Sequence, residues 1–104
     1  MNFETHNDKE INSAGTSLQG ELMLKYSDIK KVFGEPHGSD GYKSDAEWEI
    51  EFENGVVATI YNYKDGKNYN GKSGIPKSKI TNWHIGGLDE KAVKNVVKAM
   101  GEKI

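Results

Sequence analysis

Hydrophobic and polar residues alternate without interruption in residues 47–53, EWEIEFE, and this is the clearest structural signal in the chain. Successive side chains of a strand point to opposite faces of a sheet, so this pattern predicts a half-buried strand. One face would carry Trp48, Ile50 and Phe52. The other would carry glutamates, either as a solvated sheet face or as a surface for cations or a basic partner.

Asn54-Gly55 follows this strand and predicts a turn into a second one. A two-residue turn would place the apolar residues of the second strand on the face of the glutamates. A three-residue loop of Glu53, Asn54 and a left-handed Gly55 places them on the opposite face. We therefore predict that Val56, Ala58 and Ile60 align with Trp48, Ile50 and Phe52. The hairpin from Ala46 to Tyr63 would then point Tyr61 and Tyr63 away from the main core.

The N-terminal half predicts one more strand and a short helix. Alternation in residues 16–24 places Leu18, Gly20, Leu22 and Leu24 on one face of a half-buried strand. Ser27-Asp28 then has the composition of a helix start, because a hydroxyl can cap free amides and a carboxylate favours the positive end of the helix dipole. Gly34 and Pro36 would end this helix.

The C-terminal part predicts a further strand followed by a helix. The segment Ile80 to Ile85 predicts a strand with Thr81, Trp83 and Ile85 on one side, ended by Gly86-Gly87. Asp89 can cap the following helix. Its apolar stripe would contain Ala92, Val93, Val96, Val97 and Met100.

The predicted order is β-α-β-β-β-α, which indicates an α+β fold in which an antiparallel sheet carries two helices on one face. Residues 1–14 are polar and without periodicity, so we expect a flexible N-terminal tail followed by a single domain over 15–104. No run of apolar residues is long enough to span a membrane, which takes about 20. Without cysteines, a secretion signal or a span, we expect an intracellular protein.

Charge is distributed unevenly along the chain. Residues 1–53 have a net charge of −7 and residues 54–104 a net charge of +5. Such polarity can steer a partner or bring copies of the chain together, although two solvated faces would give the same pattern. We expect a homo-oligomer. Nucleic acid is an unlikely partner because the net charge is −2 and the lysines are confined to one loop and one helix face.

The segment from Lys64 to Lys79 contains three glycines, five lysines and Tyr69. Long loops of this kind are often functional, and exposed amides and lysines can close over a phosphate or an acidic protein. A plain connection between strands explains the same composition. The residues therefore leave open whether it is a binding lid or a linker.

The imidazole of His84 is the second candidate for chemistry. If it shares a face with Tyr61 and Tyr63, the three rings could hold a base by stacking and hydrogen bonding. An ordinary surface histidine is the alternative. The histidines His6, His37 and His84 are scattered, so we expect no metal site and no cofactor. No serine lies in a nucleophile motif, so we expect no catalysis, and an enzyme with His84 as general base remains only a rival hypothesis.

Several short segments together resemble a family of small proteins encoded by bacteriophages. They are GTSLQG at 15–20, FGEP at 33–36, Lys43 with Glu47-Trp48, ATIYNYK at 58–64 and NWHIGG at 82–87. The resemblance covers most of the chain after Ala14. It implies a small accessory protein in the cytoplasm of an infected bacterium, and it assigns no functional residues.

From the resemblance we expect a non-catalytic protein that counteracts host defence by binding. One version sequesters a nucleotide immune signal, a small anionic ligand such as a cyclic nucleotide. The other inhibits a host defence complex directly through a protein interface, in the manner of an anti-CRISPR protein or a nucleic-acid mimic. The candidate ligand-binding residues are Lys43, Tyr61, Tyr63, Lys64, Lys67, Tyr69 and His84.

Overall fold

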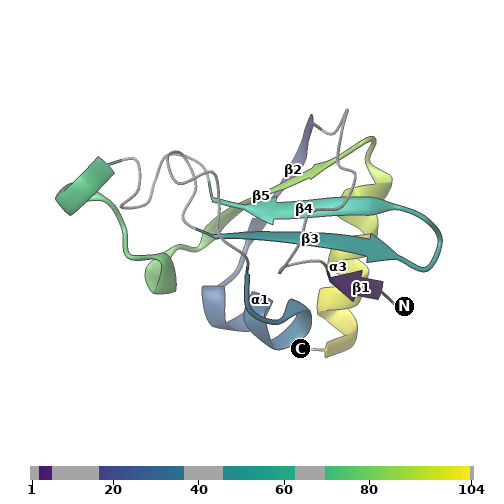
Figure 1. Ribbon diagram of the computed structural model, residues 1–104, viewed down its shortest axis with the longest axis horizontal. Coiled ribbons are helices and arrows are strands. Elements are labelled where there is room, and N and C mark those ends of the chain that lie inside the picture. Colours follow the sequence, from purple (N-terminus) through teal and green to yellow (C-terminus); the bar gives the residue numbers. More distant parts are fainter. Residues whose placement is uncertain (1–2, 6–16, 37–45, 63–69, 104) are drawn as a thin grey trace.

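The computed structural model describes residues 3–5, 17–36, 46–62 and 70–103. They form a five-stranded antiparallel sheet with two helices on one face (Figure 1). The α+β prediction is confirmed. The strands are β1 (Phe3–Thr5), β2 (Ser17–Met23), β3 (Glu47–Phe52), β4 (Val57–Tyr61) and β5 (Asn82–Gly87). The helices are α1 (Tyr26–Phe33), α3 (Lys91–Lys103) and the short 3-10 turns η1 (Gly71–Ser73) and η2 (Lys77–Lys79).

The spatial order of the strands is β1-β3-β4-β5-β2. The β3–β4 hairpin therefore lies in the middle of the sheet, and β5 separates it from β2. Both neighbouring pairs of β5 are antiparallel, as are β1 with β3 and β3 with β4. In Figure 1, α1 lies below the strands and α3 passes behind them on the right, and the two helices cover the apolar face of the sheet.

The hairpin has the predicted register. Trp48 lies opposite Ile60, and Ile50 lies opposite Ala58. Gly55 has a φ of +84°, and its amide donates to the Phe52 carbonyl over 2.9 Å, which closes a three-residue loop. The apolar side chains of both strands consequently face the helices.

An aromatic cluster forms the centre of the core. The rings of Trp48 and Trp83 meet edge to face with centroids 5.3 Å apart, and Tyr26 covers both at 5.7 and 6.0 Å. Edge-to-face and tilted pairs at these distances are favourable because the positive ring edge meets the negative ring face. Burial raises the pKa of the Tyr26 hydroxyl. The Tyr26 side chain is 7% exposed and belongs to the core.

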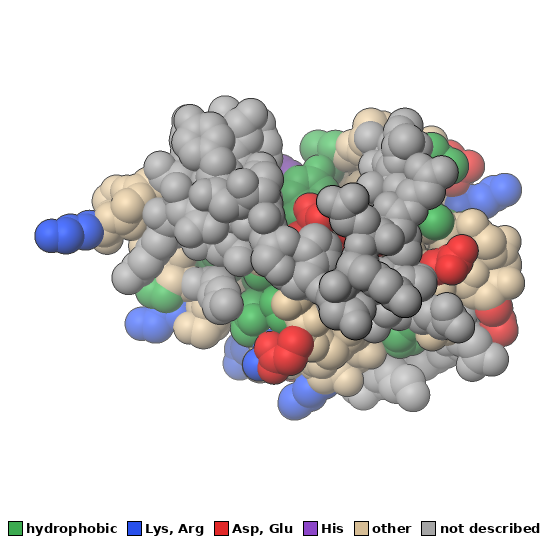
Figure 2. All heavy atoms as spheres, in the orientation of Figure 1, with side chains coloured by type: hydrophobic (Ala, Val, Ile, Leu, Met, Phe, Trp, Pro, Cys, Tyr) green, Lys and Arg blue, Asp and Glu red, His purple; other side chains and the backbone are tan. Residues whose placement is uncertain are grey.

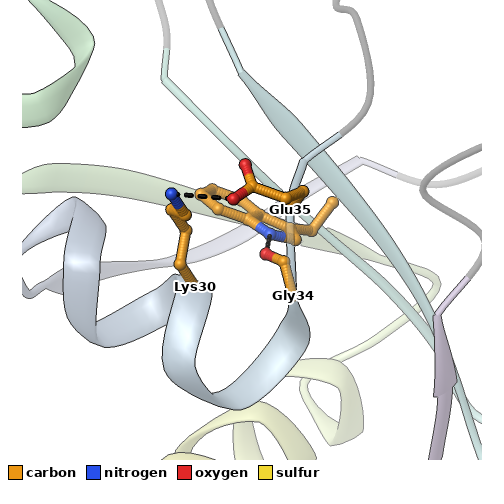
Figure 3. Close-up of polar contacts among 4 residues, drawn as sticks. Lys30, Gly34 and Glu35 are labelled. Carbon is orange, nitrogen blue, oxygen red and sulfur yellow. Dashed lines mark hydrogen bonds and ion pairs between the residues drawn. The ribbon is translucent and has the colours of Figure 1, made fainter.

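The C-terminal end of α1 is fixed to the sheet by polar contacts. Gly34 has a φ of +82°, which an L side chain rarely adopts, and its carbonyl accepts a 2.8 Å hydrogen bond from the indole N–H of Trp48 (Figure 3). Lys30 and Glu35 form an ion pair of 2.9 Å beside this bond, and the hydrogen bond to Glu35 raises the pKa of Lys30. The predicted end of the helix at Gly34 is confirmed.

The start of α1 differs from the prediction. The helix begins at Tyr26, Lys25 is the N-cap, and it makes no side-chain capping bond. Ser27 and Asp28 are thus already inside the first turn. The buried Tyr26 ring explains the earlier start, because contact with two tryptophans outweighs the roughly 1 kcal/mol that a capping hydroxyl contributes.

A β-bulge in β2 overturns part of the predicted strand pattern. The register against β5 shifts between Leu18 and Gly20, so that Leu18 pairs with Gly86 while Gly20 pairs with Ile85. Leu18 therefore lies on the face away from the helices and is 54% exposed. A prediction from alternation assumes an unbroken series of cross-strand pairs. One extra residue in the strand reverses the sheet face to which all residues beyond it point.

The predicted glycine stop of the last strand is wrong. Gly86 and Gly87 are residues of β5, paired with Thr59 and Ala58 on one side. A side chain at Gly87 would collide with the Cβ of Ala92 in α3. Here glycine permits a close approach of helix and sheet instead of a turn. At the other end, Ile80 precedes the strand; it is buried and its carbonyl accepts the indole N–H of Trp83 over 3.2 Å.

Helix α3 confirms the predicted cap and corrects the predicted stripe. A carboxylate oxygen of Asp89 accepts the amide of Lys91 over 2.8 Å. Val97 is 51% exposed, whereas Asn95 is buried and donates to the Asn54 side chain over 3.1 Å. The helix thus presents an amide to the hairpin loop at a position where hydrophobicity alone gave no signal.

The N-terminal tail is also corrected in part. Phe3–Thr5 forms the edge strand β1 on β3, where the Phe3 ring lies 4.9 Å from Phe33 and 6.0 Å from Phe52. A three-residue strand is too short for periodicity to reveal. The remainder of the expected tail, residues 1–2 and 6–14, and the first part of the lysine-rich segment, 64–69, lie outside the described residues.

Candidate functional site

The sheet face opposite the helices, called here the outer face, carries the polar side chains of the strands. Four of them form one row across the sheet because their residues are direct cross-strand partners. Tyr61 of β4 lies between Glu47 of β3 and His84 of β5, and His84 in turn pairs with Glu21 of β2. Strand alternation fixes all four on one face. This row is the best candidate site in the described part of the chain.

Tyr61 and His84 form the centre of the row. Their rings are 5.6 Å apart and inclined by 72°, so that the edge of one meets the face of the other. Both side chains are half-buried. Two planar groups at the surface of a rigid sheet form a platform on which a planar ligand group can stack.

Glu21 completes the polar part of the site. Its carboxylate lies 3.5 Å from Nε2 of His84, and its side chain is 59% exposed. An imidazole nitrogen that carries a hydrogen donates a hydrogen bond, and a carboxylate oxygen accepts one. The pair therefore offers both a donor and an acceptor to a ligand beside the aromatic platform.

A second row lies beside the first and supports it. Glu49, Thr59, Gly86 and Leu18 are cross-strand neighbours on the outer face. A Cβ built on Gly86 would lie 2.5 Å from Oγ1 of Thr59 and 3.5 Å from Cε1 of Tyr61. The missing side chain at Gly86 thus gives room for the Thr59 hydroxyl and the Tyr61 ring. Gly86 positions the platform.

Carboxylates dominate the charge of the outer face. Strand β2 contributes Glu21, and strand β3 contributes Glu47, Glu49 and Glu51, of which Glu49 and Glu47 are at least half-buried. Among the described strand residues, His84 is the one basic side chain. Described lysines belong instead to the helices and turns, and Figure 2 shows lysine side chains projecting at the periphery of the molecule. A phosphate would therefore be repelled from the middle of this face.

The structure brings two of the predicted site residues together, Tyr61 and His84. It also confirms that Tyr61 is on the face opposite Trp48. The other candidates, Lys43, Tyr63, Lys64, Lys67 and Tyr69, lie outside the described residues. Glu21 was missed. Its alternation with Leu22 shows that it faces outward, but the pairing of β2 with β5, which places it against His84, has no signature in the sequence.

Metal binding and membrane crossing are two further properties that the structure bears on. In residues 3–5, 17–36, 46–62 and 70–103, no three His, Asp or Glu side chains converge in a way that could hold a metal ion. Within the same residues, no helix has both the length and the apolar composition that crossing a bilayer requires.

Comparison with known proteins assigns the chain to no group. No protein-family model matches it. No curated protein matches it either.

Proposed function

We propose that the chain is a non-catalytic binding protein of a bacteriophage that counteracts host defence by sequestering a nucleotide signal. The phage origin rests on the sequence resemblance. The observation that carries the binding role is the edge-to-face pair of Tyr61 and His84, flanked by Glu21 on the outer face. The three groups come from three strands of a rigid sheet, an arrangement suited to a preformed site.

The row has the groups that recognise a nucleobase. Stacking of a base on an aromatic ring contributes about 1–3 kcal/mol and tolerates every base. The Glu21 carboxylate, which accepts hydrogen bonds, and the imidazole, which can donate one, add selection by the edge of the base. A base stacked on Tyr61 would reach both groups, because His84 and Glu21 follow it in the same row.

Phosphate groups of such a ligand need positive charge that the described outer face lacks. In the sequence, Lys64 and Lys67 follow Tyr61 by three and six residues. We assign the phosphates to Lys64 and Lys67 and the base to the outer face of the sheet. Binding would then weaken as salt is added, because the phosphate part of the affinity is electrostatic.

A thermal shift assay with a panel of cyclic and linear nucleotides tests the proposal. A ligand that binds only the folded protein stabilises it by about 2.7 kcal/mol at a hundredfold excess over Kd, which raises Tm by roughly 10 °C in a chain of this size. Tyr61→Ala and His84→Ala should each reduce the shift strongly, while Val97→Ala on the exposed side of α3 should leave it unchanged. The proposal fails if no nucleotide raises Tm, or if the shift survives both outer-face variants.

The same samples distinguish binding from catalysis. After incubation, the nucleotide should be recovered intact. Turnover by the parent protein that disappears in His84→Ala would support the rival enzyme hypothesis, in which Glu21 orients the imidazole as a general base.

A second candidate function is direct inhibition of a host defence protein through the acidic outer face. It is favoured by one observation, the presence of four glutamates on the outer face, one from β2 and three from β3. A basic surface that binds nucleic acid would be an electrostatically suitable target. Glu21→Gln with Glu51→Gln should then slow association with the target, whereas a nucleotide site would respond only to Glu21→Gln.

A further inference from the structure

We infer that two copies of this chain associate through strand β2, along the edge that no other described strand covers, which extends the five-stranded sheet into one continuous sheet of two subunits. This inference is independent of the proposed ligand. It rests on the position of β2 in the sheet, the direction of its backbone groups and the match between its side chains in one register.

Strand β2 lies at the edge of the sheet, next to β5 (Figure 1). No other described strand pairs with its far side. It contains seven residues, none of them proline or lysine, which are the residues that commonly protect an edge from further pairing. Its bulge lies toward the Ser17 end, so the stretch from Gly20 to Met23 keeps a regular register. Such an edge is a template for another strand.

The backbone groups at this edge point in a known direction. The amide of Leu24 donates to the Thr81 carbonyl over 3.1 Å, so Leu24 uses its polar groups toward β5. Peptide groups alternate in direction along a strand. Glu21 and Met23 therefore direct their N–H and C=O groups away from β5, toward the free edge, where a second strand can bind them.

One antiparallel register of β2 against a second β2 satisfies both the backbone and the side chains. In this register the two-fold axis passes beside Leu22, and Glu21 of each copy lies opposite Met23 of the other. Each of these pairs can exchange two N–H···O=C bonds, since both residues present their polar groups at the edge. Glu21 and Met23 also share the outer face, and Leu22 shares the helix-covered face with its own symmetry mate.

Charge disfavours the register with the two-fold axis beside Glu21. If the axis passed beside Glu21, the two Glu21 carboxylates would lie directly opposite each other, and like charges opposed in this way are destabilising. With Leu22 at the axis, the carboxylate instead lies beside the thioether of Met23. Met23 is 69% exposed in the single chain, so the pairing also removes apolar surface from water.

The association brings the two candidate sites together. The row of Tyr61, His84 and Glu21 ends at β2, and in the dimer it continues into Met23 of the second copy. The two Glu21 residues become diagonal neighbours, roughly 7–8 Å apart. Each site would thus be completed by a residue of the other subunit.

Light scattering on a size-exclusion column, with sedimentation equilibrium for the dissociation constant, tests the inference on the full chain. The parent protein should have about twice the chain mass of 11.6 kDa. Met23→Glu places a carboxylate opposite Glu21 of the other copy, whereas Met23→Lys places an ammonium there. We expect the dimer dissociation constant of Met23→Glu to be at least roughly fivefold that of Met23→Lys. The two symmetry-related pairs of residue 23 with Glu21 are repulsive in the Glu variant and attractive in the Lys variant.

Controls separate the proposed register from a general effect of charge. The double variant Glu21→Lys with Met23→Glu restores opposite charges and should restore the dimer. Val97→Glu changes another exposed apolar residue, on α3, and should not alter the mass. Circular dichroism confirms that each variant is folded. A monomeric parent chain, equal dissociation of the Glu and Lys variants, or dissociation by Val97→Glu would overturn the inference.

Discussion

The indole N–H of Trp48 donates a 2.8 Å hydrogen bond to the carbonyl of Gly34, and this contact joins the centre of the sheet to the end of α1. Trp48 is fully buried and also touches Trp83 and Tyr26, so one side chain fixes both the helix and the aromatic core.

Trp48→Phe should therefore cost about 1–3 kcal/mol of unfolding free energy, from the lost hydrogen bond and the space left by the smaller ring. Urea denaturation followed by far-UV circular dichroism measures it. Glu35→Gln, which weakens only the exposed ion pair beside this bond, should cost less than about 1 kcal/mol. Equal costs would show that the indole bond contributes nothing.

The contact at Gly86 predicts a rescue. Gly86→Ala should destabilise the protein by about 1–3 kcal/mol, because the new methyl group would lie 2.5 Å from Oγ1 of Thr59. In a Thr59→Ala background that oxygen is absent, and the same substitution should cost clearly less. A double-mutant cycle measured by chemical denaturation gives the coupling. Additive effects would mean that the new methyl group is accommodated by a shift of the whole strand and not by movement of the Thr59 hydroxyl.

Two glycines to which a Cβ can be added without a collision should respond in opposite directions. Gly55→Ala should cost about 1–2 kcal/mol, since φ is +84° and an L side chain is strained there. Gly101→Ala in α3 should stabilise by about 0.5–1 kcal/mol, because alanine loses less backbone entropy in a helix. Thermal unfolding of both variants against the parent provides the measurement. A loss of stability in both would contradict the helical state of Gly101.

Stability should fall in alkaline solution through Tyr26 and Lys30. Burial raises the pKa of Tyr26, and the hydrogen bond to Glu35 raises that of Lys30. A raised pKa means that the folded state holds its proton more tightly than the unfolded state. The resulting stability is complete below the ordinary values of about 10 to 10.5 and is lost as the pH rises through the folded values.

Urea midpoints measured between about pH 8 and 11.5 should accordingly fall less steeply for Tyr26→Phe than for the parent protein. Lys30→Met should also flatten the profile, by removing the second group. If both variants follow the parent curve, neither group is linked to folding.

The sequence predicted the elements whose evidence is local. Alternation identified β3, the position of Gly55 determined the hairpin register, and Asp89 marked the start of α3. Each depends on residues close together in the chain. For the same reason the outward direction of Tyr61 followed from the hairpin alone.

What the sequence missed depends on contacts between distant segments. The bulge that turns Leu18 outward is defined only by pairing with β5, and the early start of α1 depends on Tyr26 meeting two tryptophans. The contact of Glu21 with His84 depends on the same distant pairing. Val97 and Asn95 show that hydrophobicity gives only an approximate helix face when a polar side chain has a partner such as Asn54.

The central place of β5 has a consequence for synthesis on the ribosome. β2 is synthesised before β3 and β4, yet the one strand beside it in the described sheet is β5, which begins at Asn82 and is the last of the described strands to be made. Until that segment has left the exit tunnel, β2 has no neighbour and β4 lacks one of its two. The nascent hairpin can form first, but the described sheet becomes continuous only after β5 has emerged, so a product truncated before β5 would expose the unpaired edges of β2 and β4 to aggregation.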